Sequence, residues 1–234
     1  MSTQKLPRVI LAQYATRNVE YFKYTCKVNK YYCSAHGLEY VTEQDDVKIR
    51  SKTTDQNRSV LWYKPEFILD VMCRYEPDYV FFLDADAMIL NFDIGLDNTG
   101  RPLNIYSFIH PIFDITAAKD ASPPKFAYST YINTGSLLLK NTEKVRKFLV
   151  DWASSYLRYP ESLKLKVQDQ SGFCLTLDED AAFKASSLLI LEDVLFNSQK
   201  PTPSCFVYHA WRNKDNIKVE YDKLVSKYPD IAEQ

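Results

Sequence analysis

The sequence predicts an α/β protein of one domain, with a mostly parallel central sheet and helices on both faces. Continuous apolar runs alternate with segments whose apolar residues recur at helical spacing, and this alternation is typical of such folds. The runs VILAQY at residues 9–14 and YVFFL at residues 79–83 have the composition of strands buried on both faces. At 234 residues the chain is long for one domain and short for two, and one domain is the better expectation.

In the first half of the chain, the strand at 9–14 precedes a predicted helix at 17–36, where apolar residues recur at helical intervals and Gly37 suits the end. A second strand is expected at 38–42. The polar residues 43–58 show no periodicity and predict a loop. Proline is tolerated in a first helical turn, so a helix is expected from Pro65 to residue 75. The strand at 79–83 follows, and a further strand is expected at 104–109.

In the second half, the proline-containing residues 110–128 are interpreted as an insertion near the functional site. An apolar strand is expected at 131–140. Asn141 is the expected N-cap of a helix that reaches residue 159 and has apolar residues on one face. The remaining expected elements are a short helix at 167–177, a strand at 187–191 and a surface helix at 215–228.

Composition excludes some partners and compartments. The formal net charge of -1 provides no bulk attraction to nucleic acid or anionic lipid. Five cysteines with no CxxC pair argue against a zinc site or a disulfide framework, and we expect reduced thiols. The sequence shows neither an apolar run long enough to span a membrane nor a signal peptide, so the expected location is cytoplasmic. The 17 tyrosines suit carbohydrate binding, although most can equally be core residues.

The most informative motif is YVFFLDADAMIL, in which a buried strand ends in Asp84 and Asp86. The carboxyl edge of an open α/β sheet is where such folds bind ligands. Two aspartates this close repel each other unless a cation lies between them or water solvates them. Hard carboxylate oxygens suit Mg²⁺ or Mn²⁺. The alternative is a solvated turn after a strand, but the flanking apolar residues favour a metal site.

The motif FFLDADAMIL resembles the Asp-x-Asp strand of GT-A-fold glycosyltransferases. INTGSLLLKNTE, VQDQSGF and VYHAW follow in the order found in xyloglucan xylosyltransferases and in fungal galactosyl- and mannosyltransferases of that fold. LWYKPEFILDVM resembles their Trp-x-Lys helix, and the match spans about residues 62–214. The chain departs from the family in two ways: the family's two acids before a glutamine read Gln168-Asp169 here, and no Golgi membrane anchor is seen.

The resemblance implies one GT-A (Rossmann-like) domain over residues 1–234. Its nucleotide-binding half would be about 1–110, its acceptor-binding half about 111–214, and its C-terminal helix 215–234. The implied activity is metal-dependent transfer of a hexose or pentose, from a UDP-sugar to a hydroxyl of a glycan or glycoconjugate, with retention of configuration. Two alternatives remain. A sugar-phosphate nucleotidyltransferase would need a glycine-rich loop where the chain reads QYATRNVEY, and a non-catalytic glycan-binding domain would not need the acidic motif.

The resemblance also implies the metal ligands and the catalytic residues. His209, in VYHAW, would be the third ligand beside Asp84 and Asp86. A mixed oxygen and nitrogen site favours Mn²⁺ somewhat over Mg²⁺. Taken alone, a histidine near a strand end is more often structural. Asp169 and Gln170, at a helix start, would reach the anomeric centre of the sugar, although they can also be an exposed polar face.

The expected donor-binding residues fall into three groups. Positive side chains would stabilise the leaving diphosphate. The end of the first strand would hold the base and ribose, with Tyr14 either stacked on a pyrimidine or part of the core. The segment 133–135 would contact the sugar, where Gly135 allows close approach or simply marks a bulge. The full set is Gln13, Tyr14, Ala15, Lys64, Asp84, Ala85, Asp86, Asn133, Thr134, Gly135, Arg212 and Lys214. His36 and His110 are expected to be structural or surface residues.

Overall fold

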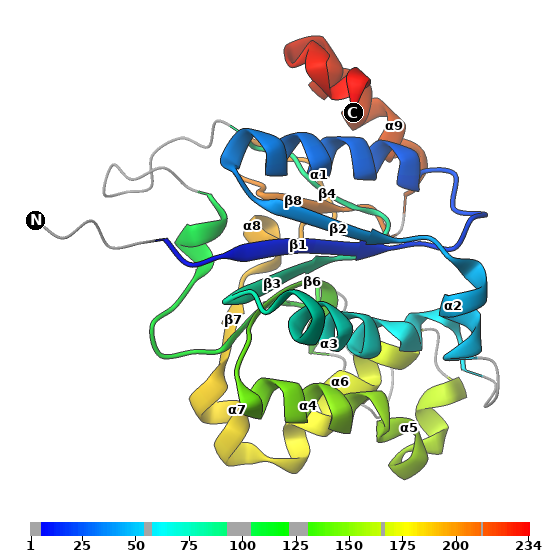
Figure 1. Ribbon diagram of the computed structural model, residues 1–234, viewed down its shortest axis with the longest axis vertical. Coiled ribbons are helices and arrows are strands. Elements are labelled where there is room, and N and C mark those ends of the chain that lie inside the picture. The colour runs from blue at the N-terminus through cyan, green and yellow to red at the C-terminus, as the bar shows by residue number, and fades with distance from the viewer. Residues whose placement is uncertain (1–5, 54–57, 93–103, 122–130, 165–166, 212) are drawn as a thin grey trace, which may run out of the picture.

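The computed structural model describes residues 6–53, 58–92, 104–121, 131–164, 167–211 and 213–234. Its main feature is a six-stranded sheet with strand order β2-β1-β3-β6-β5-β7 (Figure 1). β6 is antiparallel to both of its neighbours, whereas the other paired strands are parallel. The predicted mostly parallel sheet is confirmed. The strands are β1 (Val9–Tyr14), β2 (Glu39–Glu43), β3 (Tyr79–Leu83), β5 (Ile115–Lys119), β6 (Ile132–Lys140) and β7 (Leu188–Leu191).

Helices cover both faces of this sheet. α1 (Phe22–His36) and α9 (Asp215–Lys227) lie on one side, and α3 (Tyr63–Tyr75), α4 (Glu143–Ala153) and α6 (Gln168–Glu179) lie on the other (Figure 1). The sheet therefore separates two apolar cores. In β1, Ile10 and Ala12 enter the core beneath α3, whereas Val9 and Leu11 enter the core beneath α1. Successive side chains of a strand point to opposite faces, which is why an entirely apolar strand is needed here.

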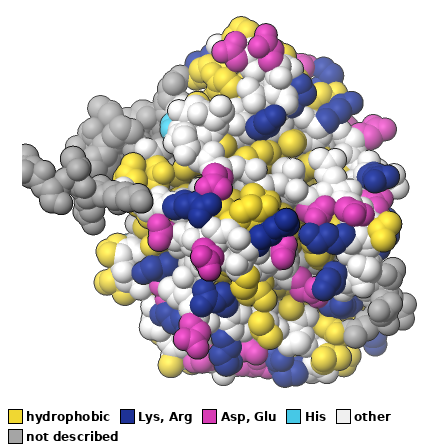
Figure 2. Space-filling view, in the orientation of Figure 1, with side chains coloured by type: hydrophobic (Ala, Val, Ile, Leu, Met, Phe, Trp, Pro, Cys, Tyr) yellow, Lys and Arg dark blue, Asp and Glu magenta, His cyan; other side chains and the backbone are white. Residues whose placement is uncertain are grey.

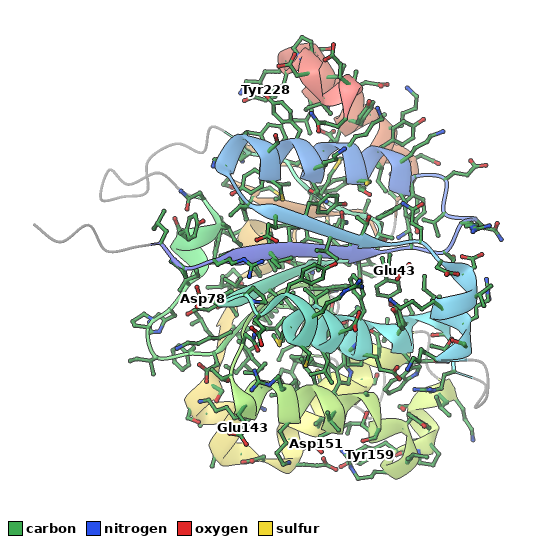
Figure 3. The ribbon with its side chains drawn as sticks, viewed as in Figure 1. Glu43, Asp78, Glu143, Asp151, Tyr159 and Tyr228 are labelled. Atoms are coloured by element: carbon green, nitrogen blue, oxygen red, sulfur yellow. The ribbon has the colours of Figure 1, made fainter. Side chains whose placement is uncertain are left out.

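Asp78 and Glu43 lie at the two opposite ends of the parallel strands, and these ends form two edges of the sheet (Figure 3). Asp78 directly precedes β3, and Glu43 is the last residue of β2. β1, β2 and β3 are parallel, so their carboxyl ends all lie at the edge marked by Glu43. Asp84 therefore emerges at that edge.

Helix ends follow local chemistry. Gly37 ends α1 in the left-handed conformation, with φ 65°, as the sequence predicted. α3 begins two residues before Pro65. The predicted N-cap of α4 was wrong by one residue: the Thr142 hydroxyl accepts from the Val145 N–H, while the Asn141 amide donates to the carbonyls of Met72 and Pro77. Asn141 thus holds the end of α3, and its Oδ1 accepts from the Arg146 side chain of α4 over 2.7 Å rather than from a backbone N–H.

Three other expectations need correction. Residues 43–58 are not all loop, because they contain the helix α2 (Asp46–Ser51). Asp45 is its N-cap, and the Asp45 carboxylate accepts from two backbone N–H groups of the helix. The expected strand at 104–109 is a 3-10 helix, η3 (Ile105–Phe108), which a capping box at Asn104 favours. The supposed insertion at 110–128 contains the buried strand β5; its residues 122–128 lie outside the described part of the chain.

A second, two-stranded sheet pairs β4 (Ala87–Ile89) with β8 (Val207–His209) in antiparallel orientation. Its register sets Ala87 opposite His209. The expected single helix at 141–159 divides into α4 and α5 (Ser155–Arg158). The remaining elements are η2 (Val60–Trp62), η4 (Pro160–Lys164), α7 (Ala181–Ser187), α8 (Asp193–Phe196) and η5 (Pro229–Glu233).

Two surface properties agree with the composition. On the face seen in Figure 2, positive and negative side chains are interspersed among the coloured residues, as the near-zero net charge suggests. None of the described helices is both long and apolar enough to cross a membrane.

Candidate metal and donor site

The Asp84-Ala85-Asp86 segment forms a tight turn directly after β3. The Ala87 N–H donates to the Asp84 carbonyl over 2.9 Å, and the Asp84 N–H donates to the Gly135 carbonyl of β6 over 2.9 Å. The Asp84 side chain is 22% exposed, whereas Asp86 is buried. The turn thus holds both carboxylates at the ligand-binding edge of the sheet.

The pairing of β4 with β8 brings His209 to these carboxylates. The Nε2 atom of His209 lies 3.1 Å from Asp86 Oδ1 and 3.7 Å from Asp84 Oδ2. One ligand atom from each residue can be chosen so that all lie within 4.8 Å of one another. Asp84, Asp86 and His209 therefore form a possible divalent metal site, as predicted. We call these three residues the triad.

The protonation state of His209 suits a metal ligand. Burial lowers the pKa of His209 to about 4; nearby Lys64 also lowers it, and the Asp84 carboxylate opposes both effects. The imidazole is therefore neutral at pH 7, which is the form that binds a metal. Among the described residues, its Nδ1 atom is buried without a hydrogen-bond partner.

Gly135 makes room for this imidazole. A Cβ atom at Gly135 would lie 2.1 Å from His209 Cε1 and 2.3 Å from His209 Nδ1. Any other residue would displace the ring, because carbon atoms do not approach this closely. The sequence suggested that glycine allows approach of a sugar or marks a bulge. The structure supplies a third reason, which is packing against a triad side chain.

Lys64, from α3, joins the triad to Asp169. Its Nζ atom lies 2.9 Å from Asp84 Oδ1 and 2.7 Å from Asp169 Oδ2, and it donates to the Thr134 carbonyl over 3.2 Å and hydroxyl over 3.1 Å. Desolvation alone would lower the pKa of Lys64, but Asp169 and Asp84 outweigh it and the pKa is raised. The lysine is 1% exposed and charged. Its ammonium group lies between two carboxylates and reduces their mutual repulsion.

Asp169 and Gln170 lie in the first turn of α6 and face β6. The Thr134 hydroxyl donates to Asp169 Oδ2 over 3.2 Å, and the Trp152 indole donates to the Asp169 carbonyl over 2.8 Å. The Gln170 amide donates to Asp120 Oδ2 over 2.6 Å. Asp169 and Gln170 are both buried, which excludes the exposed polar face that the sequence left open.

Sequence reasoning missed Asp120, although a signal existed. Asp120 directly follows the short buried strand β5, in the same way that Asp84 follows β3. The strand reads ITAAK, which is too poor in large apolar residues to be recognised.

Lys214 also reaches the triad. Its ammonium group contacts the Asp86 carboxylate and lies 5.2 Å from the centre of the Tyr21 ring. Burial lowers the pKa of Lys214 to about 8, and Asp84 opposes this shift. Tyr21 was not among the predicted residues. Arg212, which was, lies outside the described residues.

The residues at the end of β1 make contacts within the folded protein. The Tyr14 hydroxyl donates to the Val60 carbonyl over 3.0 Å, and its ring packs against Tyr63 and Phe67. Ala15 is buried. The Gln13 amide donates to two backbone carbonyls, and its Oε1 accepts from two side chains. Tyr14 therefore takes the core position that the sequence left open.

Gln168, which the resemblance suggested as the replacement of an acid, has a structural role. Its Oε1 accepts from the Trp62 indole over 3.1 Å and from the Ser59 N–H over 3.3 Å, and its amide donates to the Leu163 carbonyl over 2.6 Å. These bonds tie α6 to η2. The Asn133 side chain likewise accepts from the Gly135 N–H over 2.9 Å, within β6.

Comparison with known proteins finds similar glycosyltransferases. The model of the galactosyl transferase GMA12/MNN10 family matches residues 9–101. "Probable glycosyltransferase 3" from Oryza sativa subsp. indica and the protein of the same name from subsp. japonica are each 25% identical over 216 residues, or 87% of this chain. The predicted resemblance to these glycosyltransferases is confirmed. The chain spans 39% of the length of these two relatives.

A solved structure supports the GT-A fold. It is a glycosyltransferase involved in the glycosylation of the major capsid of PBCV-1, with a TM-score of 0.65 and 14% sequence identity. The match covers 93% of this chain and 100% of that chain. At this identity the likeness concerns the fold, and it confirms the predicted GT-A architecture.

Proposed function

We propose that this chain is a metal-dependent glycosyltransferase domain that moves a hexose or pentose from a UDP-sugar to a glycan hydroxyl. The observation that carries the proposal is the convergence of the triad on the carboxyl edge of the sheet, with Asp169 linked to it through Lys64. In the proposed division, residues 1–110 bind the nucleotide and residues 111–214 bind the acceptor.

The triad fits a divalent cation. It offers two carboxylates and a neutral imidazole, a donor set that suits Mn²⁺ or Mg²⁺. When bound, such an ion supplies positive charge to the diphosphate leaving group. Asp84, Asp86 and His209 would hold it.

Lys214 has the best-supported phosphate role among the basic residues. It is partly exposed and already contacts Asp86, so its ammonium group can reach a diphosphate next to the triad. Positive charge placed where negative charge develops lowers the barrier. Arg212 is proposed for the same role from the sequence. Lys64 is fully engaged by Asp84, Asp169 and Thr134, so we assign it an indirect effect on the donor through those partners.

Retention of configuration is the proposed stereochemical outcome. An inverting enzyme needs a carboxylate free to accept the acceptor proton. Asp169 Oδ2 instead contacts the Lys64 ammonium and accepts from the Thr134 hydroxyl, so this oxygen is already engaged within the protein. Asp169 and Gln170 would then position the sugar and stabilise its positive anomeric centre, while the leaving phosphate accepts the proton.

Calorimetry of UDP binding with and without Mn²⁺ tests the metal-dependent site. Asp86→Asn keeps the shape of the side chain and removes its charge, so Mn²⁺-dependent UDP binding should be lost while circular dichroism still reports a folded chain. Asp114→Asn is the matched control, because Asp114 is also buried but pairs with Lys144 away from the triad. Undiminished Mn²⁺-dependent affinity in Asp86→Asn would sink the proposal.

Proton NMR of the product tests retention. From an α-linked UDP-glucose or UDP-xylose donor, the product should show the small anomeric coupling of an α-linkage. A β-linked product would show that Asp169 or another group acts as a base in an inverting reaction.

A further inference from the structure

Three buried polar side chains outside the triad hold the backbone of the Asp84–Ala87 turn. They are Gln13 of β1 and Thr25 and Asn29 of α1, and each is 0% exposed. We call these residues the turn clamp. They come from the opening 30 residues of the chain, before the motifs at 62–214 that suggested the resemblance.

The turn clamp contacts three carbonyl groups of the turn. The Thr25 hydroxyl donates to the Ala85 carbonyl over 2.7 Å, and the Gln13 amide donates to the Asp84 carbonyl over 2.9 Å. The Ala87 carbonyl accepts from Gln13 over 3.1 Å and from Asn29 over 3.0 Å. The Phe22 carbonyl of the Thr25 helix is 3.1 Å away, so the shorter contact of Thr25 is the one to Ala85.

Mutual hydrogen bonds fix the orientation of both amides. Asn29 donates to Gln13 Oε1 over 2.8 Å, and the Tyr40 hydroxyl donates to the same oxygen over 2.6 Å. Asn29 Oδ1 accepts from the N–H of Ile89, the last residue of β4, over 2.9 Å. Neither amide has an unused donor hydrogen. A buried donor left unpaired is costly, so reversing either amide is strongly disfavoured.

We propose that the turn clamp positions the two aspartates of the triad. The Ala85 carbonyl shares a peptide plane with the Asp86 nitrogen, so fixing that carbonyl restricts the direction in which the Asp86 carboxylate leaves the backbone. Metal ligands must be held to within about 0.2 Å. Gln13, Thr25 and Asn29 are thus positioning residues that act through the turn backbone. The inference rests on the proposed metal-dependent function.

Thr25 allows an isosteric test. Thr25→Val removes the hydroxyl and keeps the shape, whereas Thr25→Ser keeps the hydroxyl. Thr176→Val is the matched control, because the buried Thr176 hydroxyl also donates over 2.7 Å to a carbonyl, within α6. Mn²⁺ affinity is measured by electron paramagnetic resonance of the free ion. Hydrogen–deuterium exchange of residues 84–89 is measured in metal-free protein.

Thr25→Val should weaken Mn²⁺ binding roughly 10- to 100-fold, as is typical for loss of a group that orients metal ligands. Exchange of residues 84–89 should become faster. Thr25→Ser should recover most of the affinity, and Thr176→Val should change neither readout. Wild-type affinity together with unchanged exchange in Thr25→Val overturns the inference.

Two further outcomes remain decisive. If Thr25→Val does not fold, Tyr40→Phe removes one hydroxyl from Gln13 Oε1, and unchanged exchange of residues 84–89 in that variant overturns the inference. If the wild type binds no Mn²⁺ while exchange accelerates only in Thr25→Val, the clamp holds the turn as inferred and the proposed metal-dependent function fails.

Discussion

Gly135→Ala should abolish metal binding by moving His209. The added methyl group would lie 2.1 Å from His209 Cε1 and 2.8 Å from Nε2, whereas ordinary van der Waals contact begins at 3.4 Å. Gly135 lies in a buried part of β6, its carbonyl accepts from the Asp84 N–H over 2.9 Å and its N–H donates to Asn133 Oδ1 over 2.9 Å. Because both of its backbone groups are hydrogen-bonded, its backbone has little freedom to retreat, and the imidazole must shift by about 1 Å. Such a shift is several times the tolerance of about 0.2 Å for a metal ligand.

The assay combines metal binding with a double-mutant cycle on stability. Gly135→Ala should lose Mn²⁺ affinity as completely as His209→Ala does, and overpacking should lower the free energy of unfolding by about 1–3 kcal/mol. In the His209→Ala background the methyl group gains room, so the same change should cost much less. Unaltered Mn²⁺ affinity in Gly135→Ala, or an equal stability cost in both backgrounds, would refute the reasoning.

Three further outcomes are expected. Lys64→Met leaves Asp84 and Asp169 without their shared cation and should lower the free energy of unfolding, measured in urea, by about 3–5 kcal/mol. A loss below about 1 kcal/mol would contradict a stabilising role of Lys64 between the two carboxylates. Thr142→Ala should cost about 1 kcal/mol by the same measurement, and Thr142→Ser much less, because the hydroxyl caps α4. Burial raises the pKa of Cys174 and of Cys205 to about 12, so both stay protonated at pH 8. Iodoacetamide should then modify exposed Cys73 first, as read by peptide mass spectrometry; early labelling of the buried pair would be contrary evidence.

Local composition determined much of the fold. A strand buried on both faces must be apolar at every position, so residues 9–14 and 79–83 were predicted with the bounds that β1 and β3 have. Gly37 ended α1 because a left-handed residue is needed there. The errors were local too. Asp45 before DVKIRS is a capping signal for α2, and Asn104 before IYSF is one for η3; both were overlooked.

For the metal site, the sequence and the tertiary structure each determined a different part. Asp84 and Asp86 follow from the sequence alone, because charge at the end of a buried strand has to meet water or a cation. His209 followed only from the resemblance, since a single histidine carries no sign of its partners. Its approach to Asp86, 123 residues away, depends on the β4–β8 register and on the absence of a side chain at Gly135.

Tertiary structure alone decided the roles of the buried polar residues. Lys64 was predicted to meet a diphosphate, yet its ammonium group is enclosed by Asp84, Asp169 and Thr134. Gln13 was predicted to bind the donor, yet its amide holds the Asp84 turn. A polar side chain in the sequence indicates that a hydrogen bond will be made. Which group accepts it depends on chain segments that only folding brings together, because burial forces each donor to take the nearest available acceptor.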